Sequence, residues 1–76
     1  MPWLIAKLYE ETAELSAALA PSATREHTVD ELADCLEVLQ AMATARGLRW
    51  EEVAAYAAHK RTNRGGFDEG KLWVPA

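Results

Sequence analysis

Residues 28–39 read T-V-D-E-L-A-D-C-L-E-V-L and predict a helix that carries two acids on an apolar side. At roughly 100° per residue, the apolar residues of this helix form two stripes on nearly opposite sides. The first stripe comprises Val29, Leu32, Ala33, Leu36, Leu39 and Ala43, and the second comprises Val38, Ala41, Met42 and Ala45. Glu31 and Asp34 fall on the second stripe. Because a helix that is apolar on two sides is covered on both, we expect a positive partner for these carboxylates, with a divalent metal ion as the leading candidate.

Length and charge narrow the class of protein. The 76 residues predict one domain, residues 1–76, with room for about three helices. The net charge of −4 argues against nucleic acid or an anionic membrane as a partner. Cys35 is the single cysteine and is interpreted as a small core residue, so no disulfide supplements the core and self-association to a dimer or tetramer is expected. The opening M-P-W-L-I-A-K lacks the features of a secretory signal and no stretch is long enough to span a bilayer, so we expect a cytoplasmic protein.

The hydrophobic periodicity predicts an all-α, three-helix protomer that completes a helical bundle by self-association. The expected helices cover roughly residues 2–20, 28–46 and 51–64, and a tail follows at 65–76. Pro2 suits the first turn of the first helix and Pro21 ends it. Gly47 suits the C-terminal cap of the second helix.

Acidic residues of the first helix border its stripe of leucines, which comprises Leu4, Leu8, Leu15 and Leu19. Glu11 is the most inward of these acids, and Glu10 is turned toward solvent. An alternative remains that Glu11 and Glu14 form a solvated flank paired with Lys7.

Thr28 and Glu31 have the S/T-x-x-E spacing of a capping box, in which each side chain bonds the other's backbone amide at a helix N-terminus. Capping would explain Glu31 without a metal ion. It does not explain Asp34, which lies past the first turn, where aspartate has poor helix propensity.

Two basic residues continue an apolar line on one face of the third helix. The residues on this face are Val53, Tyr56, Ala57, Lys60 and Arg64. One interpretation is that the two bases snorkel, with their stems packed and their charged ends in water. Trp50 is expected to pack as an anchor and His59 to lie on the surface. The glycines of G-G-F-D-E-G-K-L-W-V-P-A, which follows Arg64, allow backbone amides to approach a ligand closely.

Two acidic pairs thus face each other across antiparallel helices: Glu11 with Glu14 in E-x-x-E, and Glu31 with Asp34 in E-x-x-D. A spacing of three residues places both members of a pair on one side of a helix, about 5 Å apart. Facing carboxylate pairs provide the oxygen ligands that Mg²⁺ and Mn²⁺ prefer.

Three segments in this order, K-L-Y-E-E-T-A-E-L, D-E-L-A-D-C-L-E-V-L and H-K-R-T-N-R-G-G-F, resemble the MazG-like all-α nucleotide pyrophosphohydrolases. The resemblance covers roughly residues 7–72 and is closest to the phosphoribosyl-ATP pyrophosphohydrolase-like branch. It implies Mg²⁺-dependent hydrolysis of a nucleoside triphosphate between the α and β phosphates, which releases monophosphate and pyrophosphate. House-cleaning of non-standard nucleotides is one implied role.

The resemblance also implies roles for individual residues. The metal ligands would be Glu11, Glu14, Glu31 and Asp34. The substrate-binding residues would be Lys60, Arg64, Lys7 and Arg61. Lys60 and Arg64 would also stabilise charge on the leaving pyrophosphate, and Glu14 or, second, Glu10 would accept the proton of the attacking water. Members of this branch carry a further segment before the K-L-x-E-E helix, so either an oligomer supplies its place here or the chain is a reduced form that lacks catalysis.

Two questions stay open from the sequence. A non-catalytic helical dimerisation or regulatory module that retains the acidic cluster is the alternative function. The base of the nucleotide has no assigned pocket, because each of five aromatic residues is able either to stack on a base or to pack: Trp3, Tyr9, Tyr56, Phe67 and Trp73.

Overall fold

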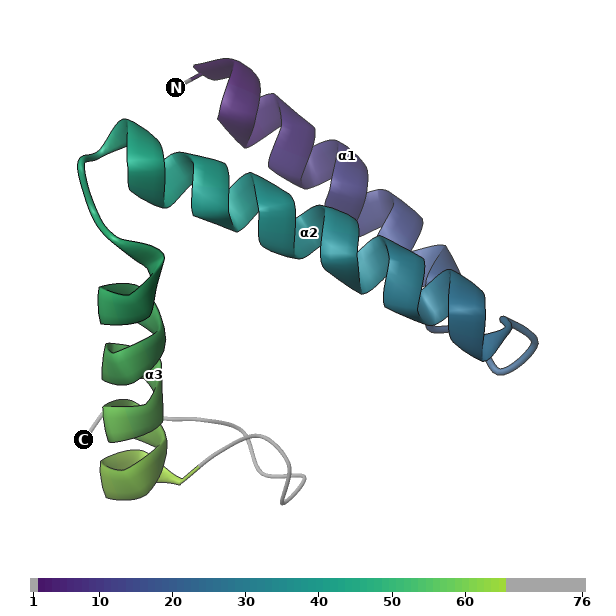
Figure 1. Cartoon of the computed structure of the whole chain (residues 1–76). Helices are drawn as coiled ribbons and strands as arrows, with labels where there is room; N and C mark the ends of the chain where they lie inside the picture. The colour runs from purple at the N-terminus through teal and green to yellow at the C-terminus, as the bar shows by residue number, and fades with distance from the viewer. Residues whose placement is uncertain (1, 66–76) are drawn as a thin grey trace.

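The computed structural model describes residues 2–65, which form three α-helices: α1 (Pro2–Ala18), α2 (Arg25–Ala45) and α3 (Trp50–Arg64). No strand occurs in this range, so the all-α prediction is confirmed for the described part of the chain. The helices α1 and α2 lie side by side and antiparallel as a hairpin, and α3 leaves the far end of α2 in a different direction (Figure 1). Of the predicted tail at 65–76, all but Gly65 lies outside the described residues.

The second helix begins three residues earlier than predicted. Thr24 is its N-cap, and the Thr24 hydroxyl accepts a hydrogen bond from the backbone N–H of His27 at 3.1 Å. The hydroxyl of Thr28 donates instead to the carbonyl of Ala18 at 2.7 Å, which satisfies an acceptor at the end of α1. The capping box of Thr28 and Glu31 is therefore wrong, and Glu31 lies well inside the helix.

The other helix ends differ little from the predicted ones. Helix α1 ends at Ala18, and its last backbone groups bond within the connector. Helix α2 ends in a Schellman arrangement, in which the N–H groups of Gly47 and Leu48 donate to the carbonyls of Thr44 and Ala43 at 2.9 and 2.8 Å. Gly47 has a φ of 73°, which is the left-handed conformation that glycine adopts without strain. The predicted cap at Gly47 is thus confirmed.

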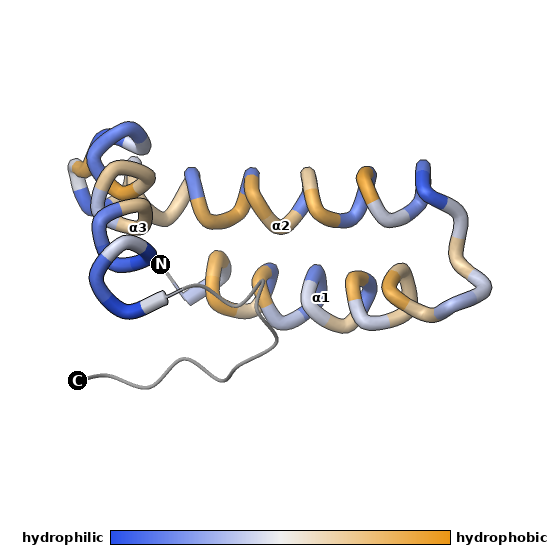
Figure 2. The backbone as a smooth tube through the Cα atoms, turned by 90° about the horizontal axis from the view of Figure 1, so that it is seen from below, coloured by the Kyte–Doolittle hydropathy of each residue, from blue (hydrophilic) through white to orange (hydrophobic). Residues whose placement is uncertain are grey.

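The hairpin has a small core. The buried apolar residues within 2–65 are Leu4, Ala18, Val38 and Ala43. Figure 2 shows apolar residues of α1 gathered along the side turned toward α2. Burial of a leucine or valine side chain contributes about 1.5–3 kcal/mol, and the two alanines contribute less because they are small. The α1–α2 contact is therefore a modest source of stability for a chain of this length.

The two predicted stripes of α2 have different environments. The stripe that carries the acids packs against α1: Val38 is buried, and Ala41 and Met42 are half-buried. The leucine-rich stripe is mostly exposed, with Leu32 at 50% and Leu36 at 42% of their full accessible area, and only Ala43 at its C-terminal end is buried. The chain by itself therefore covers one apolar side of α2 and leaves most of the other uncovered. Among residues 2–65, no helix combines the length and the apolar character needed to cross a membrane.

Candidate functional site

Glu11 occupies a core position of the α1–α2 contact. The buried residues of α1 recur every seven positions, at Leu4, Glu11 and Ala18, so the carboxylate takes the central place in an otherwise apolar row. Glu11 is 4% exposed, and its Oε2 atom is buried without a hydrogen-bond partner. A buried polar atom with no partner is costly, so this oxygen is an unsatisfied acceptor that a cation could use.

The acids of α2 meet Glu11 across the hairpin. Glu31 and Asp34 are half-buried, and one carboxylate oxygen from each lies within 4.8 Å of one from Glu11. The Oε2 atom of Glu31 is also buried without a hydrogen-bond partner. These three residues, Glu11, Glu31 and Asp34, are termed the inner acidic cluster below.

A second acidic group adjoins the inner acidic cluster on the solvent side. Oxygens of Glu10, Glu11 and Glu14 lie within 4.8 Å of one another, and Glu10 and Glu14 are exposed. Glu11 belongs to both groups. The structure therefore places all four predicted metal ligands in one continuous patch, with Glu14 at its edge.

Burial and mutual repulsion disfavour the charged forms of these carboxylates. The pKa of Glu11 is raised, first by burial and then by the hydrogen bond and the charge of Glu14 and the charge of Asp34. The pKa of Glu31 is raised, first by burial and then by the charges of Asp34 and Glu11. A bound cation opposes both effects, because it supplies positive charge where the carboxylates lack solvent.

Two side chains of the protein offer partial compensation. Lys7 Nζ lies 3.6 Å from Glu11 Oε1 and 3.5 Å from Glu10 Oε1, and Glu10 and then Glu11 raise the pKa of Lys7. His27 Nε2 lies 3.8 Å from Glu31 Oε1, so it is an ion-pair partner when the imidazole is protonated. Both contacts reach Oε1 atoms and leave the buried Oε2 atoms without a partner. The role of His27 was not predicted, although its spacing of four residues from Glu31 was a visible signal.

Cys35 lies among the acids rather than among the leucines. Its thiol is half-buried and lies 3.6 Å from the backbone carbonyl oxygen of Glu11. Burial first, and the charges of Glu11 and Glu31 next, raise the pKa of the thiol. Because the thiolate is the reactive form, this environment disfavours the reactive form of Cys35, which agrees with its interpretation as a packing residue.

A groove of about 320 Å³ starts at the inner acidic cluster and runs between α1 and α2. Glu11 and Asp34 line one end of it, and Trp3 and Ala41 line the other. Lys7 and Glu37 lie between the two ends. The volume is within the range of small-molecule sites.

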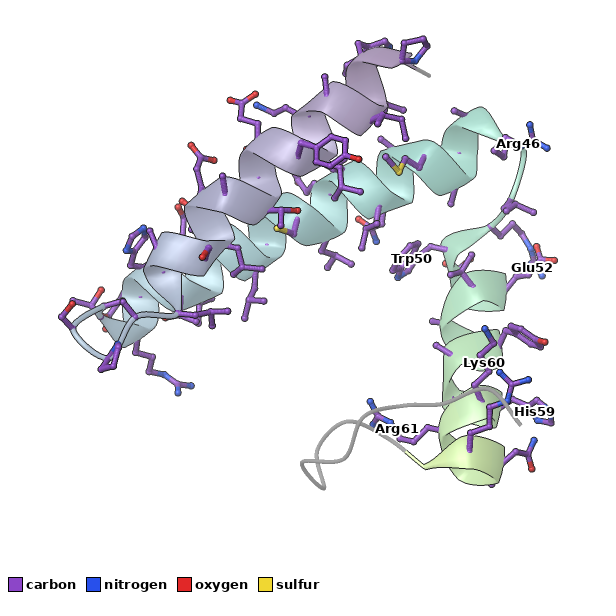
Figure 3. The ribbon with its side chains drawn as sticks, turned by 180° about the vertical axis from the view of Figure 1, so that it is seen from behind. Arg46, Trp50, Glu52, His59, Lys60 and Arg61 are labelled. Atoms are coloured by element: carbon purple, nitrogen blue, oxygen red, sulfur yellow. The ribbon has the colours of Figure 1, made fainter. Side chains whose placement is uncertain are left out.

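The basic residues of α3 are not brought to the acids within one chain. Helix α3 contacts α2 and has no contact with α1 among the described residues. Figure 3 shows Trp50 and Arg61 on the side of α3 that faces α2, and Glu52 and His59 on the opposite side. The ammonium group of Lys60 lies over the ring of Tyr56, 5.2 Å from its centre. Of the four predicted substrate-binding residues, Lys7 is the one that lies beside the acids, and Arg64 lies at the end of α3.

The chemistry of the inner acidic cluster fits a hard divalent cation. Its donors are carboxylate oxygens from α1 and α2, which are hard ligands. Two of these oxygens are buried without a hydrogen-bond partner. Oxygen ligands of this kind suit Mg²⁺ and Mn²⁺. Fold and site together define an all-α protein with a cluster of acids between paired helices that could hold a cation.

Comparison with protein families places the chain more narrowly. A family model described as the MazG nucleotide pyrophosphohydrolase domain matches residues 3–66, which is most of the chain. The protein therefore belongs to the MazG nucleotide pyrophosphohydrolase domain family, as its resemblance predicted. No curated protein and no solved structure matches the chain. The finer assignment to the phosphoribosyl-ATP pyrophosphohydrolase-like branch stays a prediction.

Proposed function

We propose that this protein is a divalent-metal-dependent nucleoside triphosphate pyrophosphohydrolase, which releases nucleoside monophosphate and pyrophosphate. The observation that carries the proposal is the pair of buried, unpartnered oxygens, Oε2 of Glu11 and Oε2 of Glu31, beside Asp34 in a chain of the MazG family. Buried carboxylates that repel one another are retained at a cost in stability. A role in holding cations for a polyphosphate substrate explains why they occur together.

The inner acidic cluster, together with Glu14, would hold Mg²⁺ or Mn²⁺. When bound, such an ion stabilises charge on phosphate oxygens and lowers the pKa of a coordinated water. Glu14 is exposed next to Glu11, which suits it to accept the proton of the attacking water, with Glu10 as the second candidate. Lys7, beside Glu11, would bind the phosphates.

Self-association forms part of the proposal. The exposed leucine stripe of α2 would pack against a second copy of the chain about a two-fold axis, as a dimer or as part of a tetramer. Such an assembly is also the route by which Lys60, Arg61 and Arg64 of one copy would reach the acids of another. There Lys60 and Arg64 would take charge that develops on the leaving pyrophosphate.

The substrates we expect are non-standard nucleotides, whose removal is a house-cleaning function in the cytoplasm. A panel of standard, deoxy and damaged-base triphosphates with Mg²⁺ tests this expectation. The predicted products are monophosphate and pyrophosphate. Orthophosphate as the sole product would contradict the assignment.

Asp34→Asn is the variant that separates catalysis from the alternative, a non-catalytic dimerisation module. We expect it to abolish pyrophosphate release and to leave the helices intact, because it removes one of several repelling charges. Asp30→Asn is the matched control, since Asp30 is exposed one turn away on the same helix. Full activity in Asp34→Asn, or its marked unfolding, would favour a structural role for the acid.

A further inference from the structure

We propose that Trp3 is the residue on which the base of the nucleotide stacks, at the end of the groove opposite the inner acidic cluster. The inference rests on the proposed function, because it assumes that the acidic end of the groove receives the phosphates. It assigns the nucleoside end of the substrate, which the acidic motifs leave without a site. Glu11, Asp34 and Trp3 line the same groove.

Trp3 lies on the same side of α1 as Glu11, at a distance that suits a nucleotide. Trp3, Lys7 and Glu11 follow one another at intervals of four residues along α1, so they lie on one side of that helix. Helix α2 runs antiparallel to α1 (Figure 1), and its groove residues Asp34 and Ala41 therefore lie opposite Glu11 and Trp3 respectively. Eight residues at 1.5 Å each separate Trp3 from Glu11 by about 12 Å along the helix. That length matches the reach from the phosphates of a nucleotide to the far part of its base.

The indole ring of Trp3 is exposed and available for stacking. Trp3 is 69% exposed although it borders a groove, and the structure gives its indole no hydrogen bond or ring contact within residues 2–65. A large aromatic ring in this state exposes a flat face on which a base is able to stack. Tyr9 is also exposed on α1 but does not line this groove, and Tyr56 lies on α3 under the Lys60 ammonium. Phe67 and Trp73 lie outside the described residues.

The charges along the groove indicate which end of it takes the phosphates of the substrate. The inner acidic cluster attracts cations and, through them, phosphates. Lys7 and Glu37 both line the middle of the groove, but the Lys7 ammonium lies at its acidic end, 3.6 Å from Glu11 Oε1. The Glu37 carboxylate disfavours a phosphate in the middle and is an acceptor for hydroxyl or amino groups of a nucleoside. The phosphates thus belong at Glu11 and Asp34, and the base belongs at Trp3.

Binding measured without turnover tests the proposal on the full chain. The probes are a non-hydrolysable nucleoside triphosphate and inorganic tripolyphosphate, each with Mn²⁺, and the readout is calorimetric affinity. Trp3→Ala should weaken nucleotide binding about 5- to 150-fold, the usual range for loss of one stacked base, and should leave tripolyphosphate binding unchanged. Trp3→Phe should restore most of the nucleotide affinity, because it retains an aromatic face. Tyr9→Ala, an exposed aromatic outside the groove, should affect neither ligand.

The outcomes are distinguishable. Unchanged nucleotide affinity in Trp3→Ala, or an equal loss for nucleotide and tripolyphosphate, overturns the assignment of Trp3. An equal loss accompanied by dissociation in sedimentation would show that Trp3 packs between copies of the chain instead. Selective loss of nucleotide affinity in a protein that releases no pyrophosphate would retain the base site and remove the proposed hydrolysis.

Discussion

The two sides of α2 reverse the usual distribution of residues. The side that faces α1 carries Glu31 and Asp34 into partial burial, whereas the outer side exposes Leu32 and Leu36. A helix selected for the stability of one chain would place the leucines inside and the acids in water. Under the proposed function, the covered side gives up stability to hold a cation, and the outer side retains apolar surface for a second copy of the chain.

Glu31→Gln gives the largest effect among the tests that follow, because, like Asp34→Asn, it removes a charge from the covered side. We expect pyrophosphate release to fall about 100-fold or more, the scale on which loss of one electrostatic contributor acts. Steady-state assays of pyrophosphate with Mg²⁺ measure it. Glu26→Gln is the control, since Glu26 is exposed in the first turn of the same helix. Equal activity of the two variants would show that the covered acid has no special role.

Leu36→Asp tests the outer side, with the next largest effect. A charge placed in the leucine stripe should raise the dissociation constant of the assembly about 30-fold or more, as truncation of an interface hot spot does. Sedimentation velocity across protein concentration measures it. Leu36→Met should assemble normally, because it preserves apolar volume. A protein that sediments as a monomer before any substitution would leave the exposed stripe without the proposed partner.

The pH dependence of the free energy of unfolding gives a smaller effect, which also tests the covered side of α2. Glu11 and Glu31 have folded-state pKa values raised above the ordinary 4.5, so the folded metal-free protein holds their protons more tightly than the unfolded chain does. Their contribution to the free energy of unfolding is therefore present in full below pH 4.5 and is lost as pH rises through the raised values. Denaturant titrations in chelator should show this decline in the wild type and a smaller one in Glu31→Gln.

Saturating Mg²⁺ should remove the same decline, because it stabilises the charged carboxylates. At a concentration 100 times its dissociation constant, the ion raises the folding equilibrium constant about 100-fold at neutral pH. An identical pH profile with and without Mg²⁺ would mean that the raised pKa values of Glu11 and Glu31 have no connection with cation binding.

Much of this arrangement was predictable from periodicity. Spacings of three and four residues identified three helices, the inward position of Glu11 and the two stripes of α2, and Gly47 marked the end of that helix. These features depend on neighbours along the chain, which the sequence displays directly.

The errors concern contacts between segments. Thr24 and Thr28 are both suited to cap a helix. Thr24 is the N-cap, whereas the Thr28 hydroxyl bonds the carbonyl of Ala18, ten residues away in the chain. Periodicity found two apolar sides of α2 and predicted that both are covered, but one chain covers chiefly the side that carries Glu31 and Asp34. The direction of α3 after Gly47, and hence its lack of contact with α1, depends on the conformation of a four-residue connector that no periodic pattern describes.

Anomalous scattering from a crystal soaked in Mn²⁺ and a non-hydrolysable nucleoside triphosphate tests the cation site most directly. The predicted result is a Mn²⁺ peak bounded by Glu11, Glu31 and Asp34, with the triphosphate next to it, and no such peak in Asp34→Asn. Side chains of these acids turned to separate places, with Mn²⁺ bound elsewhere or not at all, would contradict the central claim.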